Sequence, residues 1–163
     1  MRRKSFADMD CAVARTLEHI GDRWTMLVLR NAFHGMKRFD RFQEHLGIAP
    51  NILADRLRKL VRAGILERRD LPDDGRGVEY RLSEKGLDLY PLVVAMSEWG
   101  ERWEGNGKGP RLRLLERASG EPIAPMRVRA ADGRPLQPRE VKPVAGPGAN
   151  AHVLGLLEST ERE

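Results

Sequence analysis

Between residues 39 and 82 the spacing of hydrophobic and polar positions changes in a definite order. FDRFQEHL is short and amphipathic, and after the glycine-containing GIAPN comes a longer basic segment, ILADRLRKLVRA. Apolar residues three and four positions apart predict a helix for each. Beyond Gly64, ILERRDL and VEYRL flank the tip PDDGRG, which predicts two strands joined by a glycine-rich turn. This order predicts an α+β fold of the winged helix-turn-helix type.

Two further helices are expected before this segment. Asp10 can cap a helix over residues 11 to about 20, which Gly21 ends. Asp22 can cap a second helix over RWTMLVLRNAF. The second helix is apolar around nearly its whole circumference, so it should lie at the centre of a three-helix core.

A long helix is expected after the second strand, opened by Ser83 with Glu84 and continuing through Trp103. Its apolar positions recur at helical spacing and form one stripe, made of Leu92, Met96, Trp99 and Trp103. Pro91 lies inside this pattern and should bend the helix or break a hydrogen bond. A pair of tryptophans could stack on a cofactor, but helical spacing favours a core or a dimer seam, and no cofactor is expected.

The basic segment has the marks of a DNA-reading helix. Pro50 suits its first position, and Gly64 suits the residue just beyond its end. At 100° per residue the leucines fall on one face, namely Leu53, Leu57 and Leu60. The polar residues fall on the opposite face, with the lysine at its edge: Asn51, Asp55, Arg58, Arg62 and Lys59. The polar face is therefore expected to enter the major groove of duplex DNA.

The residue types divide the expected contacts. Asn51 can bond adenine and Arg58 can donate two bonds to guanine, so these two are assigned to bases. Arg62, Lys59 and Arg38 are assigned to the phosphate backbone, which gives affinity without sequence information. Asp55 either accepts from a cytosine amino group or orients a neighbouring cation, and the second is favoured.

The tip between the strands carries one projecting cation, Arg76. An arginine is favoured in a narrow minor groove, where the negative potential is enhanced. Asp73 and Asp74 beside it oppose a close approach to phosphates, and the alternative is a solvated hairpin tip. A groove contact by Arg76 is the preferred expectation.

Charge and composition narrow the class of protein. The 163 residues carry a net charge of +5, and residues 37–69 hold nine basic against four acidic residues, so the excess lies on the expected DNA-reading element. A single cysteine excludes a disulfide framework and points to a reducing, cytoplasmic compartment. No apolar run is long enough to span a membrane.

The composition changes near Gly105. Seven of the ten prolines and seven of the sixteen glycines lie between residues 105 and 150. We therefore expect a winged domain over residues 1–104, a β-hairpin extension over 105–150 and a tail over 151–163. The sequence Gly-x-Pro-[Ile/Leu]-x-Pro begins at Gly120 and again at Gly133, which implies two similar hairpins after a strand at residues 112–116.

Residues 11 to 103 resemble the HxlR-type winged-helix transcriptional regulators, which are related to the MarR group. The resemblance rests on CAVARTLEHIGDRWTMLVLRNAFHGMKRFDRFQEHLGIAPNILADRLRKLVRAGILERR, on VEYRLSEKG, and on LYPL with EWGERW. The family's usual Pro after the cysteine is Ala12 here, and its usual Ser before the DNA-reading helix is Ala49. Ala49 removes a capping oxygen, a loss of about 1 kcal/mol where such a cap is made. Neither departure undoes the fold.

The resemblance implies a homodimer on roughly palindromic operator DNA, most often as a repressor. The tryptophan-containing stripe, together with the first helix, is then the dimer interface, and the long helix bearing it is a dimerisation helix. The extension resembles a zinc-knuckle tail of some relatives, but Ser119, Arg129 and Asp132 stand where paired cysteines would be. No metal is therefore expected, since tetrahedral zinc needs thiolates or imidazoles.

Cys11 is a candidate thiol sensor. The start of a helix lowers the pKa of a thiol, and Arg15 one turn later could stabilise a thiolate. Similar proteins sense electrophiles or oxidants at this cysteine, which implies a small-molecule or electrophile effector. Asp8 and Asp10 oppose this, and a buried apolar thiol is inert.

No catalytic motif accompanies these features. The chain has no Gly-rich phosphate loop, no nucleophile elbow and no acid pair with a supporting histidine, so it is not expected to be an enzyme. The alternative to DNA binding is a winged helix that serves as a protein–protein module, with the basic helix on an acidic partner.

Overall fold

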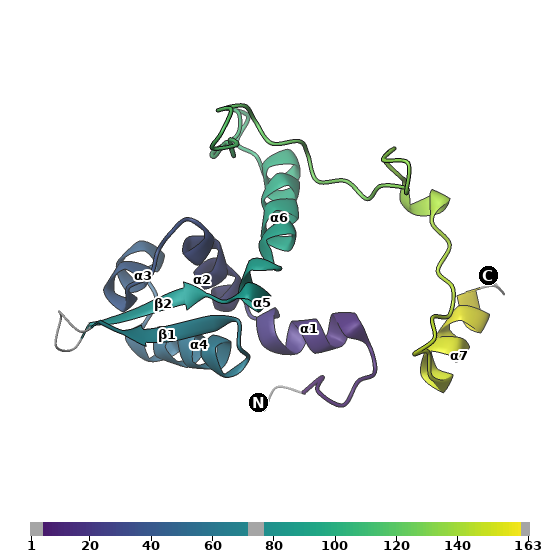
Figure 1. Cartoon of the computed structure of the whole chain (residues 1–163), viewed down its shortest axis with the longest axis horizontal. Coiled ribbons are helices and arrows are strands. Elements are labelled where there is room, and N and C mark those ends of the chain that lie inside the picture. Colours follow the sequence, from purple (N-terminus) through teal and green to yellow (C-terminus); the bar gives the residue numbers. More distant parts are fainter. Residues whose placement is uncertain (1–4, 72–76, 161–163) are drawn as a thin grey trace.

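The computed structural model describes residues 5–71 and 77–160. Its elements follow one another as α1 (Ala12–Ile20), α2 (Arg23–Phe33), α3 (Phe39–Leu46), α4 (Pro50–Arg62), β1 (Leu66–Asp70), β2 (Val78–Leu82), α5 (Glu84–Leu87), α6 (Tyr90–Trp103), the short 3-10 helix η1 (Pro138–Glu140) and α7 (Ala151–Thr160). The order of α3, α4, β1 and β2 confirms the predicted winged helix-turn-helix, an α+β fold (Figure 1).

The core forms around α2, as its apolar sequence predicts. Val28 and Leu29 of α2 are completely buried, and they pack in one cluster with Phe42 of α3 and the leucines of α4. Asp22 caps α2 as expected, since its carboxylate accepts hydrogen bonds from the backbone N–H groups of Trp24 and Thr25. The cap fixes where α2 begins, and the buried face fixes what packs against it.

The wing is an antiparallel pair of strands that joins the start of α3. β1 and β2 pair from Leu66 opposite Leu82 to Asp70 opposite Val78. The backbone N–H of Tyr80 donates to the carbonyl of Lys37 at 2.8 Å, so β2 is tied to the residue just before α3. The tip with Arg76 lies outside the described residues.

The expected cap of α1 is wrong. The helix begins at Ala12, and Cys11 occupies the capping position without a side-chain hydrogen bond. The carboxylate of Asp10 instead accepts a hydrogen bond of 2.6 Å from the side-chain amide of Asn150. The Asp10 carboxylate, which the sequence pattern assigned to the cap of α1, is therefore bound by Asn150, a residue far away in the sequence.

The single long helix expected through Trp103 is also wrong, because the chain forms α5 and α6 instead. Ser83 does cap α5, accepting from the backbone N–H of Gly86 at 3.0 Å. Pro91 lies in the first turn of α6. Its ring has no N–H and clashes with the carbonyl four residues earlier, so a continuous helix cannot pass this point.

The extension forms turns rather than strands. The strand expected at residues 112–116 is wrong, because only a single bridge joins Leu115 to Pro122. The second repeat has a matching bridge from Arg129 to Pro135, and Gly120 and Gly133 both have positive φ, 75° and 88°. Prolines lack the N–H that a ladder needs, which keeps each pairing to one bridge. The sequence did not predict α7.

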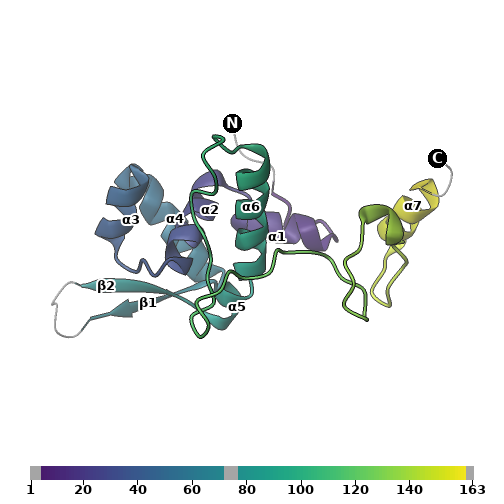
Figure 2. The ribbon, with the colours of Figure 1, turned by 90° about the horizontal axis from the view of Figure 1, so that it is seen from above.

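Figures 1 and 2 show where the extension runs. It leaves the end of α6, turns back along that helix, and then crosses to the start of α1, where α7 lies. Near α6 it is held by Glu98, whose carboxylate accepts hydrogen bonds from the backbone N–H of Met126 at 3.0 and 3.1 Å. The winged part and the extension are therefore joined at two separate places.

Gly86 provides a test of the packing between α5 and the turn after α4. A Cβ at this buried position would overlap the backbone carbonyl oxygen of Ile65. We expect Gly86→Ala to lower the free energy of unfolding by about 1–3 kcal/mol, the usual cost of overpacking. Urea unfolding at one protein concentration measures it.

Gly100→Ala in α6 is the matched control. A Cβ there meets no heavy atom of the described residues within 4 Å. The substitution should stabilise the helix by about 0.5–1 kcal/mol, because alanine restricts the unfolded chain more than glycine does. Equal unfolding midpoints for the two variants would contradict the account of the α5 contact.

Candidate nucleic-acid interface

The candidate interface is built on α4, whose ends lie where the sequence predicts. Pro50 is its first residue, and Ala49 caps it without a side-chain hydrogen bond. Gly64 follows its end with φ of 68°, a conformation that favours glycine. The backbone therefore stops the helix abruptly and turns directly into β1.

The two faces of α4 separate as its periodicity predicts. Leu53, Leu57 and Leu60 are at most 1% exposed and face α2 and the rest of the core. The opposite face reaches solvent through Asn51, Arg58, Lys59 and Arg62. An α-helix with an exposed polar face of this kind can enter the major groove of DNA while its apolar face stays packed on the core.

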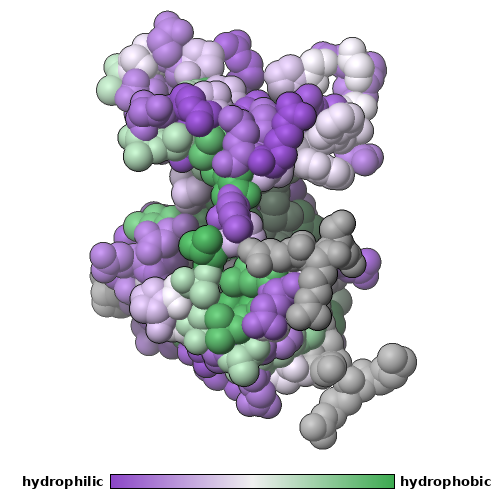
Figure 3. Space-filling model, turned by 90° about the vertical axis from the view of Figure 1, so that its right-hand side faces the viewer, coloured by the Kyte–Doolittle hydropathy of each residue, from purple (hydrophilic) through white to green (hydrophobic). Residues whose placement is uncertain are grey.

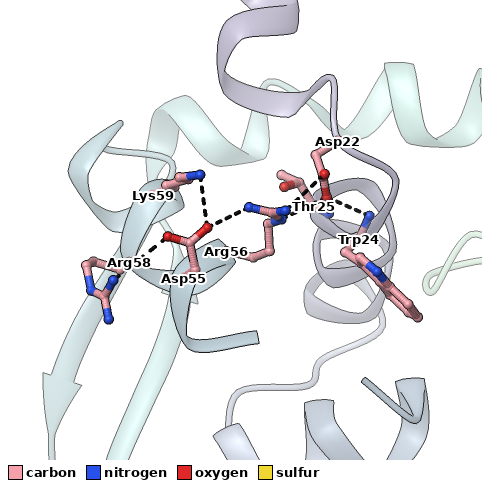
Figure 4. A network of polar contacts seen from close by, with 7 residues as sticks. All are labelled: Asp22, Trp24, Thr25, Asp55, Arg56, Arg58 and Lys59. Carbon is pink, nitrogen blue, oxygen red and sulfur yellow. Dashed lines mark hydrogen bonds and ion pairs between the residues drawn. The ribbon is translucent and has the colours of Figure 1, made fainter. Parts of the chain in front are cut away.

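Asp55 lies at the centre of an ion-pair network on this face (Figure 4). Its Oδ2 is 2.9 Å from the Lys59 ammonium and 2.6 Å from Nη1 of Arg56, and its Oδ1 is 3.8 Å from Nη1 of Arg58. Of the two roles left open for Asp55, this geometry favours orienting its cationic neighbours. The longer distance to Arg58 leaves that guanidinium freer to move than Lys59.

Arg56 is the residue that the sequence reasoning missed. Its guanidinium makes a two-pronged contact with Asp22, from Nε to Oδ1 at 2.8 Å and from Nη2 to Oδ2 at 3.1 Å (Figure 4). The Asp22 oxygen that accepts from Nε also caps α2. Arg56 therefore ties α4 to the start of the central helix α2.

The carboxylates of this network have lowered pKa values. Burial raises the pKa of Asp22, but the charge of Arg56 and hydrogen bonds from Thr25, Arg56 and Trp24 outweigh it and hold the pKa below its usual range. For Asp55 the hydrogen bond from Lys59 is the largest cause, and the charges of Lys59, Arg56 and Arg58 add to it, so its pKa is also lowered. Both groups are ionised at neutral pH.

Other predicted contact residues lie off α4. Arg38 precedes α3, and its backbone forms an isolated antiparallel β-bridge with Glu79 of the wing. Its side-chain Nε lies 3.8 Å from a carboxylate oxygen of Asp40. Arg62 is exposed near the end of α4, and within residues 5–71 and 77–160 no ion pair to it is found. Arg76 lies outside the described residues, so its groove contact stays a prediction.

The wing strand β1 carries two arginines whose charges are locally balanced. Arg68 pairs with Asp70 at 2.9 Å, and Arg69 pairs with Glu67 at 2.7 Å. Such exposed pairs are worth little energy and exchange readily for other anions. On this strand the positive charge is offset, whereas the end of α4 presents Arg62 openly.

The candidate thiol and the apolar stripe lie away from α4. Cys11 is half-buried at the start of α1, and Arg15 is exposed one turn later. The stripe on α6 is open to solvent: Leu92 is 40% exposed, Met96 51%, Trp99 60% and Trp103 63%. Their neighbours Val93 and Val94 are buried, so α6 has one face on the core and another that is uncovered.

Among residues 5–71 and 77–160, no group of three or more His, Cys, Asp or Glu side chains is arranged to hold a metal ion. No helix there has the length and apolar content that crossing a membrane requires.

Residues 19–108 match the family described as HxlR-like helix-turn-helix. An uncharacterized HTH-type transcriptional regulator of Mycobacterium tuberculosis (strain H37Rv) is 38% identical over 140 residues, which cover 86% of this chain and 89% of that protein. YdeP of Bacillus subtilis, also described as an uncharacterized HTH-type transcriptional regulator, is 35% identical over 95 residues, covering 58% of this chain and 74% of YdeP.

Solved structures give the same picture. The crystal structure of PA1607, described as a candidate transcription factor, superposes with a TM-score of 0.81 at 43% identity, covering 88% of this chain and 100% of that one. The redox regulator HypR in its reduced form superposes with a TM-score of 0.53 at 35% identity, covering 56% of this chain and 92% of HypR. The similarity to PA1607 includes much of the extension, since residues 1–104 are less than two thirds of the chain.

The lowered pKa of Asp22 predicts how acid affects stability. The carboxyl binds its proton less readily in the folded chain than in the unfolded one, whose value is about 3.9. Its stabilising contribution is therefore complete above that value and is lost as pH falls through the lower folded pKa. We expect the melting temperature to fall as the pH drops below about 4, and to fall less in Asp22→Asn.

Asparagine also caps helices well, so Asp22→Asn removes the charge and keeps the cap. The control is Asp40→Asn. The Asp40 carboxyl is 73% exposed and its contact with Arg38 is long, at 3.8 Å, so the melting temperature of this variant should fall with pH as that of the wild type does. Melting curves recorded by circular dichroism across this pH range decide. An Asp22→Asn profile parallel to the wild type would contradict the role of the Arg56 pair.

Proposed function

The chain belongs to the HxlR-like helix-turn-helix family, and on this basis we propose that it is a sequence-specific DNA-binding repressor acting as a homodimer on a roughly palindromic operator. The similar proteins of Mycobacterium tuberculosis and Bacillus subtilis are described as transcriptional regulators, not as enzymes. The observation that carries the proposal is the exposed cationic face of α4, held rigidly against the core by its leucines and Arg56.

We assign different tasks to the residues of that face. Arg58 is 62% exposed and only loosely paired, so its guanidinium can turn to make two bonds to a guanine. Asn51 at the start of α4 can bond an adenine edge. Lys59, fixed by Asp55, and Arg62 at the helix end meet phosphates, with Arg38 contributing from the start of α3.

The uncovered stripe on α6 supports a dimer. Two large tryptophans at 60% and 63% exposure are unusual on a monomer surface, and together with Met96 they form one continuous helix face. A twofold axis near this face would present two copies of α4 to successive major grooves, about 34 Å apart. A dimer with twofold symmetry would bind the same base sequence on each side of its axis, so its operator should be a palindrome.

The alternative function is a winged helix that binds an acidic protein instead of DNA. Salt separates the two, because each phosphate contact releases counterions and makes affinity for DNA fall steeply as salt rises. Sequence-dependent duplex binding with that behaviour supports the repressor. Duplex binding that is absent or indifferent to sequence favours the protein partner.

The assignment of bases and phosphates predicts two different mutant behaviours. Arg58→Ala should lose about 1–3 kcal/mol of binding free energy and relax selectivity at one base pair. Arg62→Ala should weaken binding to all sequences alike and lower the salt slope by about one. The measurement is fluorescence anisotropy on an operator selected from random duplexes, repeated with each single-base variant of that operator.

Arg117→Ala in the extension is the matched control, since Arg117 is exposed and far from α4 along the chain. It removes the same charge and should leave both affinity and selectivity unchanged. Identical selectivity profiles for Arg58→Ala and Arg62→Ala would refute the division of tasks while leaving DNA binding intact.

We also propose an electrophile or oxidant as effector, acting at Cys11. HypR, which has a similar fold at 35% identity, is described as a redox regulator. Cys11 lies at the start of α1, next to Asp10, which anchors Asn150 of the extension. A bulky adduct on this half-buried sulfur would therefore disturb a contact between the winged part and the extension.

Alkylation tests the effector. Purified protein treated with a quinone or methylglyoxal should change its operator affinity, and Cys11→Ser should not respond, because it lacks the thiolate. Arg15→Ala should slow the reaction of the thiol, since it removes the nearby positive charge. An unchanged affinity in the wild type, or the same change in Cys11→Ser, rules out sensing at this residue.

A further inference from the structure

Residues 128–160 of the extension stand away from the winged domain: residues 128–149 run between two anchors, and α7 follows the second. The extension leaves α6 where Arg127 lies 3.7 Å from Glu98, and it returns to α1 where Asn150 donates to Asp10. Hydrogen bonds within it are local, such as Arg129 to the carbonyl of Gly133 and Arg134 to Glu140. Figures 1 and 2 agree that the segment crosses from α6 to α1 apart from the core.

This segment, which we term the arm, carries apolar side chains that its own chain leaves uncovered. Val128 is 68% exposed, Val141 48%, Val144 75%, Leu154 45% and Leu156 58%. Figure 3 views the end of the molecule that carries α7, where hydrophobic surface gathers below the hydrophilic turns of the extension. Five exposed apolar side chains within one segment offer an apolar contact surface to a partner.

The winged part has uncovered apolar surface of its own on α1 and α6. Besides the α6 stripe, Val13 is 68% and Leu17 is 44% exposed on α1. Since a tryptophan presents up to about 250 Å², the open parts of Trp99 and Trp103 amount to roughly 300 Å², and the four other apolar residues bring the total to roughly double this. A stable dimer buries about 800 Å² on each partner, so these six side chains make up most of such an interface and other residues must supply the rest.

We propose that the arm clasps a second copy of this chain, its apolar side chains covering the exposed α1 and α6 residues of the partner. The inference rests on the proposed homodimer and goes beyond it, since it makes residues 128–160 part of the interface. The arm's five exposed apolar side chains would add to the apolar area of the α1 and α6 face. The two anchors hold Arg127 and Asn150 on the same chain, so that the segment between them, and α7 after the second anchor, can reach the partner.

The distribution of the extension among similar proteins supports the proposal. The Mycobacterium tuberculosis relative aligns over 86% of this chain, and the PA1607 crystal structure superposes over 88% of it with a TM-score of 0.81. A superposition of that extent requires a similar course for much of the extension in both. YdeP and HypR match only 58% and 56% of this chain.

The first experiment measures dimer dissociation by sedimentation equilibrium of the full chain. Leu154→Asp with Leu156→Asp places two charges on the apolar side of α7 and should raise the dimer dissociation constant at least tenfold. His152→Asp with Ser159→Asp is the control, since it adds the same charges at exposed polar positions of the same helix. The control should dimerise as the wild type does.

The second experiment asks whether α7 lies on its own chain or on the partner. Trp99→Asp should break the dimer at an exposed position of α6 without unfolding the domain, which circular dichroism verifies. The backbone amides of residues 151–160 should then exchange hydrogen at least tenfold faster, although α7 itself is unchanged. Trp103→Asp, exposed on the same stripe, provides an independent variant should Trp99→Asp fail to fold.

The outcomes separate the arm from the dimer. If Leu154→Asp with Leu156→Asp dimerises like the wild type, or if α7 keeps its protection in a monomeric Trp99→Asp or Trp103→Asp variant, the arm does not clasp the partner, although the α6 dimer stands. Wild-type protein that sediments as a monomer overturns both. DNA affinity measured on the same samples reports separately on the proposed regulator.

Discussion

The structure depends on how α4 is held against α2. Leu53, Leu57 and Leu60 are almost completely buried there, and each such side chain contributes about 1.5–3 kcal/mol relative to an exposed one. Because these leucines occupy one face, the direction of the opposite face is not adjustable. Arg56 adds a directional constraint, since its planar guanidinium meets both oxygens of Asp22. The exposed cations of α4 are thus mounted on a rigid support.

Because α4 is held on one face, the residues that stabilise its position differ from those that it exposes to solvent. Residues that hold α4, such as Arg56 and Asp22, are largely buried and paired, whereas Arg58 and Arg62 extend into solvent. Asp55 lies between the two groups and lowers the local charge without removing it. The ion pair with Asp55 holds the Lys59 side chain along the helix. The wing continues directly from Gly64, so its position follows from that of α4.

Local signals in the sequence predicted most of the fold, and distant partners account for the errors. Pro50, Gly64 and Asp22 act on the backbone beside them, so the ends of α4 and α2 could be predicted. Asp10 was assigned to a helix cap, but its partner Asn150 is 140 residues away. Arg56 was overlooked for the same reason, because helical periodicity does not reveal that Asp22, 34 residues earlier, meets it. The effect of Pro91 was foreseen in kind, as a bend or a broken hydrogen bond, but not as the complete separation of α5 from α6.

The central claim is that the outward face of α4 contacts duplex DNA, and side-chain NMR observes this face directly. The Nε–H signals of Arg58 and Arg62 and the amide signals of Asn51 can be followed while a selected operator duplex is added to the full chain. The account predicts that these signals shift or broaden at stoichiometric duplex, while those of Arg139 and Arg113 in the extension do not. Unchanged α4 signals, with perturbation confined to other surfaces, would contradict it.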